Sequence, residues 1–200
     1  YNGVTRLDNA QSVAAGSGGV NFTMSVATIL ARHDAQYNGI TVFSTFSSGQ
    51  ISESCYYGVK FPVSVLPAAF TVFGMQFWNN DYDMFWPRIM LCEDASGKPN
   101  LTNVLREVRN YQGKETDFSL VEWEEITLTN GRDIWVVFQL PNKQFVNVGE
   151  GPALGFENNT STFFDSFYYS SNGGASFSKL GGANRYDPLV SLTVGLTTAP

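Results

Sequence analysis

Charged residues are scarce in this chain, and basic clusters are missing. Only 15% of the 200 residues are Asp, Glu, Lys or Arg, against roughly 25% in an average soluble domain. Lys and Arg nowhere cluster and the net charge is −6, so the electrostatic surface that holds a phosphate backbone is absent. This composition argues against a nucleic-acid partner and favours an extracellular or cell-surface protein.

Long apolar runs are also missing. The most apolar stretch, residues 63–78, is interrupted by Pro67 and Gly74 and is too short to span a bilayer. We therefore expect no membrane insertion. Apolar residues still make up 43% of the chain, with 16 Phe, 9 Tyr and 4 Trp, which is enough to build one substantial core.

A single histidine and two cysteines restrict catalytic and metal chemistry. His33 would have to serve as the base of any Ser-His-Asp triad, but no Gly-X-Ser-X-Gly elbow accompanies it, and zinc would need more ligands at recognised spacing. We therefore expect a protein that is not an enzyme. Cys55 and Cys92 leave two alternatives open. They form either a disulfide, worth about 3–4 kcal/mol in an oxidising compartment, or two buried free thiols.

Short runs rich in β-branched and aromatic residues, each ended by Gly, Pro, Asn, Asp or Ser, are what the chain does contain. Asn130-Gly131 lies between two such runs, 120–129 and 132–140, and predicts a type I′ hairpin. Residues 21–34 fit both helical and strand spacing, and we prefer the strand. Further strands are predicted at 39–46, 56–65, 70–78, 86–93, 101–108, 163–169, 175–180 and 188–196, although the charges of 101–108 would also suit a short helix. The pattern predicts an all-β fold, a two-sheet antiparallel sandwich of the jelly-roll kind.

Several strand and turn segments occur in a characteristic order from about Tyr56 to Leu196. They are residues 57–61, 94–99, 123–128, 133–138, 166–174 and the closing hydrophobic strand. This order resembles the jelly-roll-like β-sandwich modules of secreted and cell-surface multidomain proteins of bacteria, of the adhesin or protease-appended type. The resemblance implies a noncatalytic role in adhesion, carbohydrate binding, folding support or assembly at the cell exterior.

Residues 1–50 have no counterpart in these modules. We expect an N-terminal extension over 1–50 that could be exchanged with a neighbour, followed by a sandwich over 51–200; one domain over 1–200 is the alternative.

Aromatic residues provide the candidates for ligand binding. Trp86, Tyr168 and Tyr169 could stack on sugar rings, because an aromatic face complements the apolar side of a pyranose. Most aromatic side chains of a sandwich nevertheless belong to its core. Tyr168 and Tyr169 are adjacent, so in a strand they lie on opposite faces and in different environments.

Acidic and amide side chains suggest further sites. Asp81 and Asp83 are oxygen ligands two residues apart in a loop, which makes them candidate ligands for calcium. Glu122 and Glu124 point the same way in a strand; the solvent face of an outer strand is a simpler interpretation than the paired carboxylates of a glycosidase. Sequons, which matter only in a glycosylating host, begin at Asn21, Asn100, Asn158 and Asn159.

Two hypotheses about function follow from these observations. The first is a non-enzymatic extracellular structural or adhesion protein that self-associates through β-edges, as a homo-oligomer or polymer, into a surface filament or sheath. The alternative is a carbohydrate-binding module of a secreted protein, with a glycan as its partner.

Overall fold

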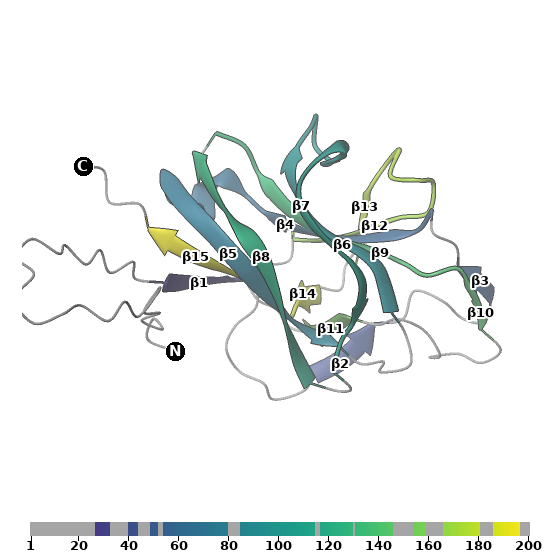
Figure 1. Cartoon of the computed structure of the whole chain (residues 1–200). Coiled ribbons are helices and arrows are strands. Elements are labelled where there is room, and N and C mark those ends of the chain that lie inside the picture. The colour runs from purple at the N-terminus through teal and green to yellow at the C-terminus, as the bar shows by residue number, and fades with distance from the viewer. Residues whose placement is uncertain are drawn as a thin grey trace, which may run out of the picture.

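The computed structural model describes residues 27–32, 40–43, 49–51, 54–79, 85–114, 117–129, 131–145, 154–158, 166–180 and 186–196. Two antiparallel sheets packed against each other make up most of these residues (Figure 1). The predicted all-β sandwich is therefore confirmed. No helix in the described ranges is long and apolar enough to cross a membrane.

The larger sheet, sheet I, has seven strands. Its main path places β1, β15, β5 and β8 side by side, and three further strands extend it beyond one end of β5 through Leu154, which pairs with Asn79. The strands are β1 (Ala27–Ala31), β2 (Ile40–Phe43), β5 (Ala69–Asn79), β8 (Asp117–Thr129), β11 (Leu154–Asn158), β14 (Tyr186–Pro188) and β15 (Val190–Leu196).

The second sheet, sheet II, has six strands in the order β13-β12-β4-β9-β6-β7. A one-turn 3-10 helix, η1 (Val63–Val65), connects it to sheet I, and a separate two-stranded ribbon pairs β3 (Gly49–Ile51) with β10 (Lys143–Phe145). The strands of sheet II are β4 (Tyr56–Phe61), β6 (Phe85–Asp94), β7 (Pro99–Gln112), β9 (Ile134–Gln139), β12 (Phe167–Ser170) and β13 (Ser178–Lys179).

The chain crosses repeatedly from one sheet to the other. It runs from β4 in sheet II to β5 in sheet I and returns to sheet II for β6 and β7. It then crosses to sheet I for β8, goes back to sheet II for β9, and closes with β15 in sheet I. The resulting four-strand layers, β1-β15-β5-β8 and β4-β9-β6-β7, have the strand order of a jelly roll.

The core lies between the two sheets because each strand turns alternate side chains inward. Tyr57, Val59 and Phe61 point into it from β4, and Val136 and Phe138 from β9, all fully buried. Sheet II is also apolar on its outer face, where a second, smaller group of side chains is buried: Tyr56, Met90, Cys92, Trp135 and Val137.

The strands on either side of Asn130-Gly131 exist, but they do not form the predicted hairpin. β8 pairs with β5 in sheet I, whereas β9 lies between β4 and β6 in sheet II. The reason is burial. All six residues of β9 are buried, so this strand needs cover on both faces, which sheet II provides through the core on one face and the smaller apolar group on the other. β8 alternates between buried and exposed residues, which suits a strand with one face in solvent. The prediction was wrong because an Asn-Gly turn does not specify which strands will pair.

The segment over 1–50 contributes strands to the sandwich where it is described. β1 pairs along its whole length with β15, and β2 pairs with β11. The ambiguous segment 21–34 thus contains a strand at Ala27–Ala31.

Candidate functional site

Trp86, proposed from the sequence as part of an aromatic platform, belongs to the core. Its side chain is 1% exposed, and its ring packs edge-on against Phe77 and Phe138. The indole Nε1 donates a hydrogen bond to Oδ1 of Asn79 at 2.9 Å. Because no ligand can reach this ring, the prediction of a binding role for Trp86 was wrong.

Tyr168 and Tyr169 lie on opposite faces of β12, as their adjacency predicts. Tyr169 faces the main core, with its ring centroid 6.0 Å from that of Tyr57 and its hydroxyl donating to Sγ of Cys55 at 3.4 Å. Partial burial, together with Cys55, raises the pKa of Tyr169. This inward position removes Tyr169 from any platform on the surface.

Tyr168 takes part in a different group, the outer aromatic cluster, which consists of Tyr56, Trp135, Tyr168 and Phe177 on the outer face of sheet II. The ring of Tyr168 meets the ring of Trp135 edge-on with centroids 5.0 Å apart, and Phe177 lies 6.0 Å from Trp135. Tyr56 and Trp135 are buried, whereas Tyr168 and Phe177 are half-buried. The cluster therefore presents two partly exposed rings on a buried base.

Charged groups border the outer aromatic cluster. The Lys60 ammonium lies 5.8 Å from the ring centroid of Trp135 and forms a 2.8 Å ion pair with Asp133. Partial burial alone would raise the pKa of Asp133, but Lys60 and the backbone N–H of Val63 outweigh it, so the pKa lies below its ordinary value. A fixed ion pair beside aromatic rings can bind hydroxyl groups as well as charged groups.

The two cysteines are free and buried. Cys55 belongs to the core between the sheets and Cys92 to the outer face of sheet II. Cys55 lies beside Leu140 and Cys92 beside Trp135, positions that are about 16 Å apart along β9. A disulfide between them is ruled out by this distance, and the alternative of two buried thiols is correct. Burial raises the pKa of Cys92 to about 12.

The remaining predicted site residues are only partly covered by the structure. Asp81, Asp83 and Asn21 lie outside the described residues, as does the side chain of Asn158. Within the described ranges, no three His, Cys, Asp or Glu side chains come together as metal ligands. Asn100 lies near the start of β7, where its Oδ1 accepts hydrogen bonds from Thr102 and from the backbone N–H of Asn103.

The sequence interpretation missed a surface that we call the seam, where the edge strands β7 and β8 of the two sheets meet. These strands lie side by side without pairing, so side chains bridge them. Arg106 of β7 donates from Nε to the backbone O of Glu124 at 2.7 Å and from Nη2 to the O of Glu125 at 2.8 Å. The hydroxyl of Tyr111 donates to the O of Leu120 at 2.7 Å.

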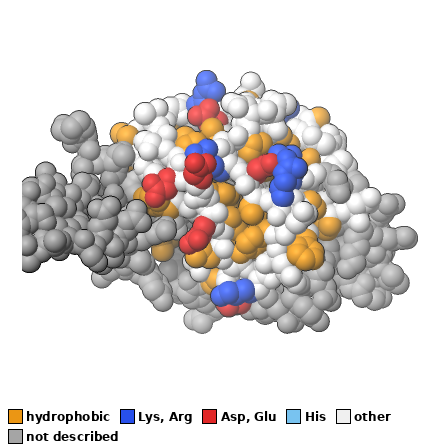
Figure 2. Space-filling view, viewed as in Figure 1, with side chains coloured by type: hydrophobic (Ala, Val, Ile, Leu, Met, Phe, Trp, Pro, Cys, Tyr) orange, Lys and Arg blue, Asp and Glu red, His pale blue; other side chains and the backbone are white. Residues whose placement is uncertain are grey.

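Exposed apolar side chains lie near one end of the seam, Leu120 on β8 and Phe85 at the start of the neighbouring strand β6. Leu120 is 55% exposed and Phe85 is 51% exposed, the highest values among the large hydrophobic residues that the structure describes. Both lie near Tyr111, whose hydroxyl donates to the backbone O of Leu120 and whose neighbour Gln112 pairs with Phe85. The ring of Tyr111 itself packs against the core, 6.0 Å from the ring of Phe77. Figure 2 shows hydrophobic side chains gathered in the middle of this face, with acidic and basic side chains around them.

The sequence did contain a signal for Leu120. In a strand, Leu120 shares its face with Glu122 and Glu124, whose exposure confirms that this is the solvent face of β8. Leu120 is a large apolar residue on the same face of the strand as charged residues, so its exposure could have been predicted from the sequence. No comparable pattern points to Phe85, because apolar residues follow it on both faces of β6.

The seam is bordered by charges of opposite sign. Glu122, Glu124 and Glu125 are exposed on β8. On the other side, Oε2 of Glu107 accepts from Nε of Arg88 and Oε1 accepts from Nε of Arg109, both at 2.7 Å. Partial burial would raise the pKa of Glu107, but the two arginines outweigh it, so the pKa lies below its ordinary value.

Comparison of this chain with models of known protein families, with curated proteins and with solved structures gives no match.

Proposed function

We propose that this protein is a non-enzymatic assembly or adhesion protein of the cell exterior that self-associates through the seam. The observation that supports this function best is the pair of half-exposed apolar side chains, Phe85 and Leu120, on either side of Tyr111. Single exposed apolar residues are common on protein surfaces, but apolar residues grouped together and surrounded by polar ones are typical of a contact surface.

The energy available at this surface suits association. Fully burying a Phe or Leu side chain is worth roughly 1.5–3 kcal/mol. Because Phe85 and Leu120 are about half exposed in the single chain, covering each would contribute roughly 1 kcal/mol. When two copies meet through the same surface, Phe85 and Leu120 of each copy are covered, so the total contribution is doubled.

The contacts at the seam differ from the strand-to-strand pairing that the sequence suggested. Arg106 and Tyr111 already donate hydrogen bonds to backbone carbonyl groups along the free edge of β8. A strand added to this edge would have to displace them. We therefore propose that side chains of the seam, and not the backbone of β8, make the contacts. Low charge and an Asn-, Ser-, Thr- and Gly-rich polar composition support the extracellular location.

Sedimentation velocity of the full chain over a range of concentrations tests the proposal. We expect the wild-type protein to associate with rising concentration and the double variant Phe85→Ser, Leu120→Ser to remain a monomer. The matched control is Val63→Ser, Val65→Ser, which removes two apolar side chains that are 40% and 41% exposed on η1. A wild-type protein that stays monomeric, or a seam variant that associates like the control, would contradict the proposal.

A second function, glycan binding, is favoured by one observation. The outer aromatic cluster holds the half-buried rings of Tyr168 and Phe177 on buried Trp135, with Lys60 and Asp133 beside them. Aromatic faces next to polar groups are the usual means of binding sugar rings.

Affinity electrophoresis in gels that contain neutral or acidic polysaccharides tests this second function. We expect retardation of the wild-type protein, and loss of retardation in Tyr168→Ala and Phe177→Ala. Phe118→Ala is the control, because Phe118 is a half-buried aromatic residue on sheet I. Equal mobility of all proteins in every gel would exclude the cluster as a glycan site.

A further inference from the structure

We propose that the seam binds a second copy of this chain in a closed dimer, whose two-fold axis sets the β8 side of each copy against the β7 side of the other. The inference rests on the proposed function and specifies its partner and geometry. It comes from the distribution of charge on the two sides of the seam and from the position of the apolar residues near Tyr111.

The β8 side of the seam is acidic. The strand contains four acidic residues and no Lys or Arg, and all four are exposed. They are Asp117, Glu122, Glu124 and Glu125. Asp117 has a single described ion-pair partner, Lys114, at a distance of 3.7 Å. Glu122, Glu124 and Glu125 have no ion-pair partner within the described ranges, so their charges are available to a partner molecule.

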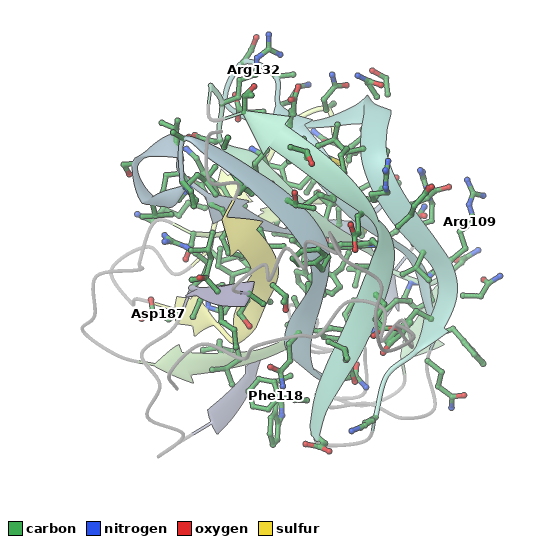
Figure 3. The ribbon with its side chains drawn as sticks, turned by 60° about the vertical axis from the view of Figure 1, so that its left-hand side comes forward. Arg109, Phe118, Arg132 and Asp187 are labelled. Atoms are coloured by element: carbon green, nitrogen blue, oxygen red, sulfur yellow. The ribbon has the colours of Figure 1, made fainter. Side chains whose placement is uncertain are left out.

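The β7 side of the seam is basic. Arg88, Arg106, Arg109 and Lys114 lie along it, and Glu107 is the acidic residue among them. Figure 3 shows Arg109 beside β7, pointing away from the sandwich, and Phe118 near one end of β8. The most exposed cations of this side are Arg109, at 64%, and Lys114, at 68%. Glu107 neutralises only part of this positive charge.

A half turn can set one seam against another in two ways, and the charges favour one of them. A half turn about an axis along the strands exchanges the two sides of the seam, so each acidic side meets a basic side and the apolar residues near Tyr111 meet those of the other copy. A half turn about an axis across the strands would place acidic residues on acidic residues, which is unfavourable by several kcal/mol. The charge pattern therefore selects a pair in which both contacts are equivalent.

The seam is also large enough for such an interface. β7 has 14 residues and β8 has 13, and strands of this length extend for about 45 Å. A standard interface buries about 800 Å² on each partner. Packed sheets lie about 10 Å apart, so the strip between the two strands covers about 450 Å², and the side chains that flank it on both outer faces supply the remainder. Because the contact is closed, it yields dimers and does not propagate into a fibre.

Charge reversal tests the dimer directly. The acid-reversed variant is Glu122→Lys, Glu124→Lys, and the base-reversed variant is Arg109→Glu, Lys114→Glu. All four residues are exposed, so the fold should tolerate the changes. The control variant is Lys179→Glu, Arg132→Glu, which reverses two exposed charges outside the seam. Sedimentation equilibrium gives the dissociation constant of each protein, and native mass spectrometry of mixtures identifies mixed dimers.

The expected result has three parts. The wild-type and control proteins form dimers of equal affinity. Each reversed variant alone dimerises at least about tenfold more weakly, since like charges then face each other. A mixture of the two reversed variants regains the wild-type affinity, because in the mixed dimer all charge contacts are again between opposite signs. Should a reversed variant fail to fold, the neutral variant Glu122→Gln, Glu124→Gln must weaken the dimer in the same direction.

The contrary results separate this inference from the proposed function. Reversed variants that dimerise like wild type, a mixture that regains no affinity, or assemblies larger than a dimer would overturn the two-fold seam while leaving self-association intact. A wild-type protein that is monomeric at every concentration would overturn both.

Discussion

Replacing Arg106 by lysine should destabilise the protein, although the charge is kept. Arg106 donates from Nε and Nη2 to two backbone carbonyls of β8, and from Nη1 to the O of Leu105 at 2.8 Å. Lysine has one ammonium group, which cannot reproduce the planar fork of donors that joins two neighbouring carbonyls. A hydrogen bond from a charged donor is worth roughly 1.5–3 kcal/mol, and less at an exposed site.

From these values we expect Arg106→Lys to lower the free energy of unfolding by about 1.5 kcal/mol. For a chain of this size that corresponds to a decrease in Tm of roughly 3–6 °C. Urea unfolding followed by far-UV circular dichroism measures the change. The matched control is Arg109→Lys on the same strand. Because Arg109 is 64% exposed and bonds a single carboxylate, this substitution should lower the free energy of unfolding by less than about 0.5 kcal/mol.

Equal unfolding midpoints for Arg106→Lys and Arg109→Lys would refute this reasoning. The two sheets would then be held together at the seam by core packing alone, and the hydrogen bonds to Glu124 and Glu125 would contribute nothing measurable.

Three further predictions concern the rest of the sandwich. Gly74→Ala should cost roughly 3 kcal/mol or more of stability, because a Cβ there would collide with the backbone O of Val121, whereas Gly131→Ala, with open space around it, should change the urea midpoint little. Burial raises the pKa of the Cys92 thiol to about 12, so this thiol should resist iodoacetamide at pH 8 and react only in urea. Mass spectrometry of the alkylated peptide measures the labelling, and rapid labelling of the folded protein would contradict the burial of Cys92. Asp133→Asn should destabilise the protein at neutral pH. Because the folded-state pKa of Asp133 is lowered, its contribution to stability is present above the unfolded pKa and is lost as the pH falls through the folded pKa. The urea midpoints of the wild-type and Asp133→Asn proteins should therefore converge in the acid range, and a difference that does not change with pH would count against the charged contact with Lys60.

Much of the fold could be predicted from local patterns. Alternation in β8 places Val121 and Trp123 inward and Glu122 and Glu124 outward, and the structure confirms it. Period-two patterning succeeds here because each face of the strand has a single environment, core or solvent.

The partners of the strands could not be predicted in the same way. The Asn-Gly dipeptide favours a turn of the chain, but pairing depends on which neighbours can bury the residues that follow. Ile134–Gln139 is buried on both faces, and an edge strand such as β8 has only one partner. A hairpin signal describes four residues, whereas the choice between two sheets depends on the whole sandwich.

The site residues show the same limit of local information. Trp86 and Tyr168 are both aromatic residues in strand-like runs, yet one is in the core and the other on an outer face. Cys55 and Cys92 fall at comparable positions in their runs but on different faces of sheet II. In each pair the sequence gives the chemistry of the side chain, and the sheet order decides what it can touch.

The seam illustrates why an apolar residue on a polar face is informative. Leu120 lies in the exposed phase of β8 and keeps 55% of its surface in solvent, so a charged residue there would cost the single chain little. The stability of the monomer therefore does not account for leucine at this position. Phe85 adds a second such side chain on the other side of Tyr111, and two sheets whose edges cannot pair leave this surface open. A contact that covers both residues explains their chemistry, which is why the seam and not the bare edge of β8 is the surface on which association should depend.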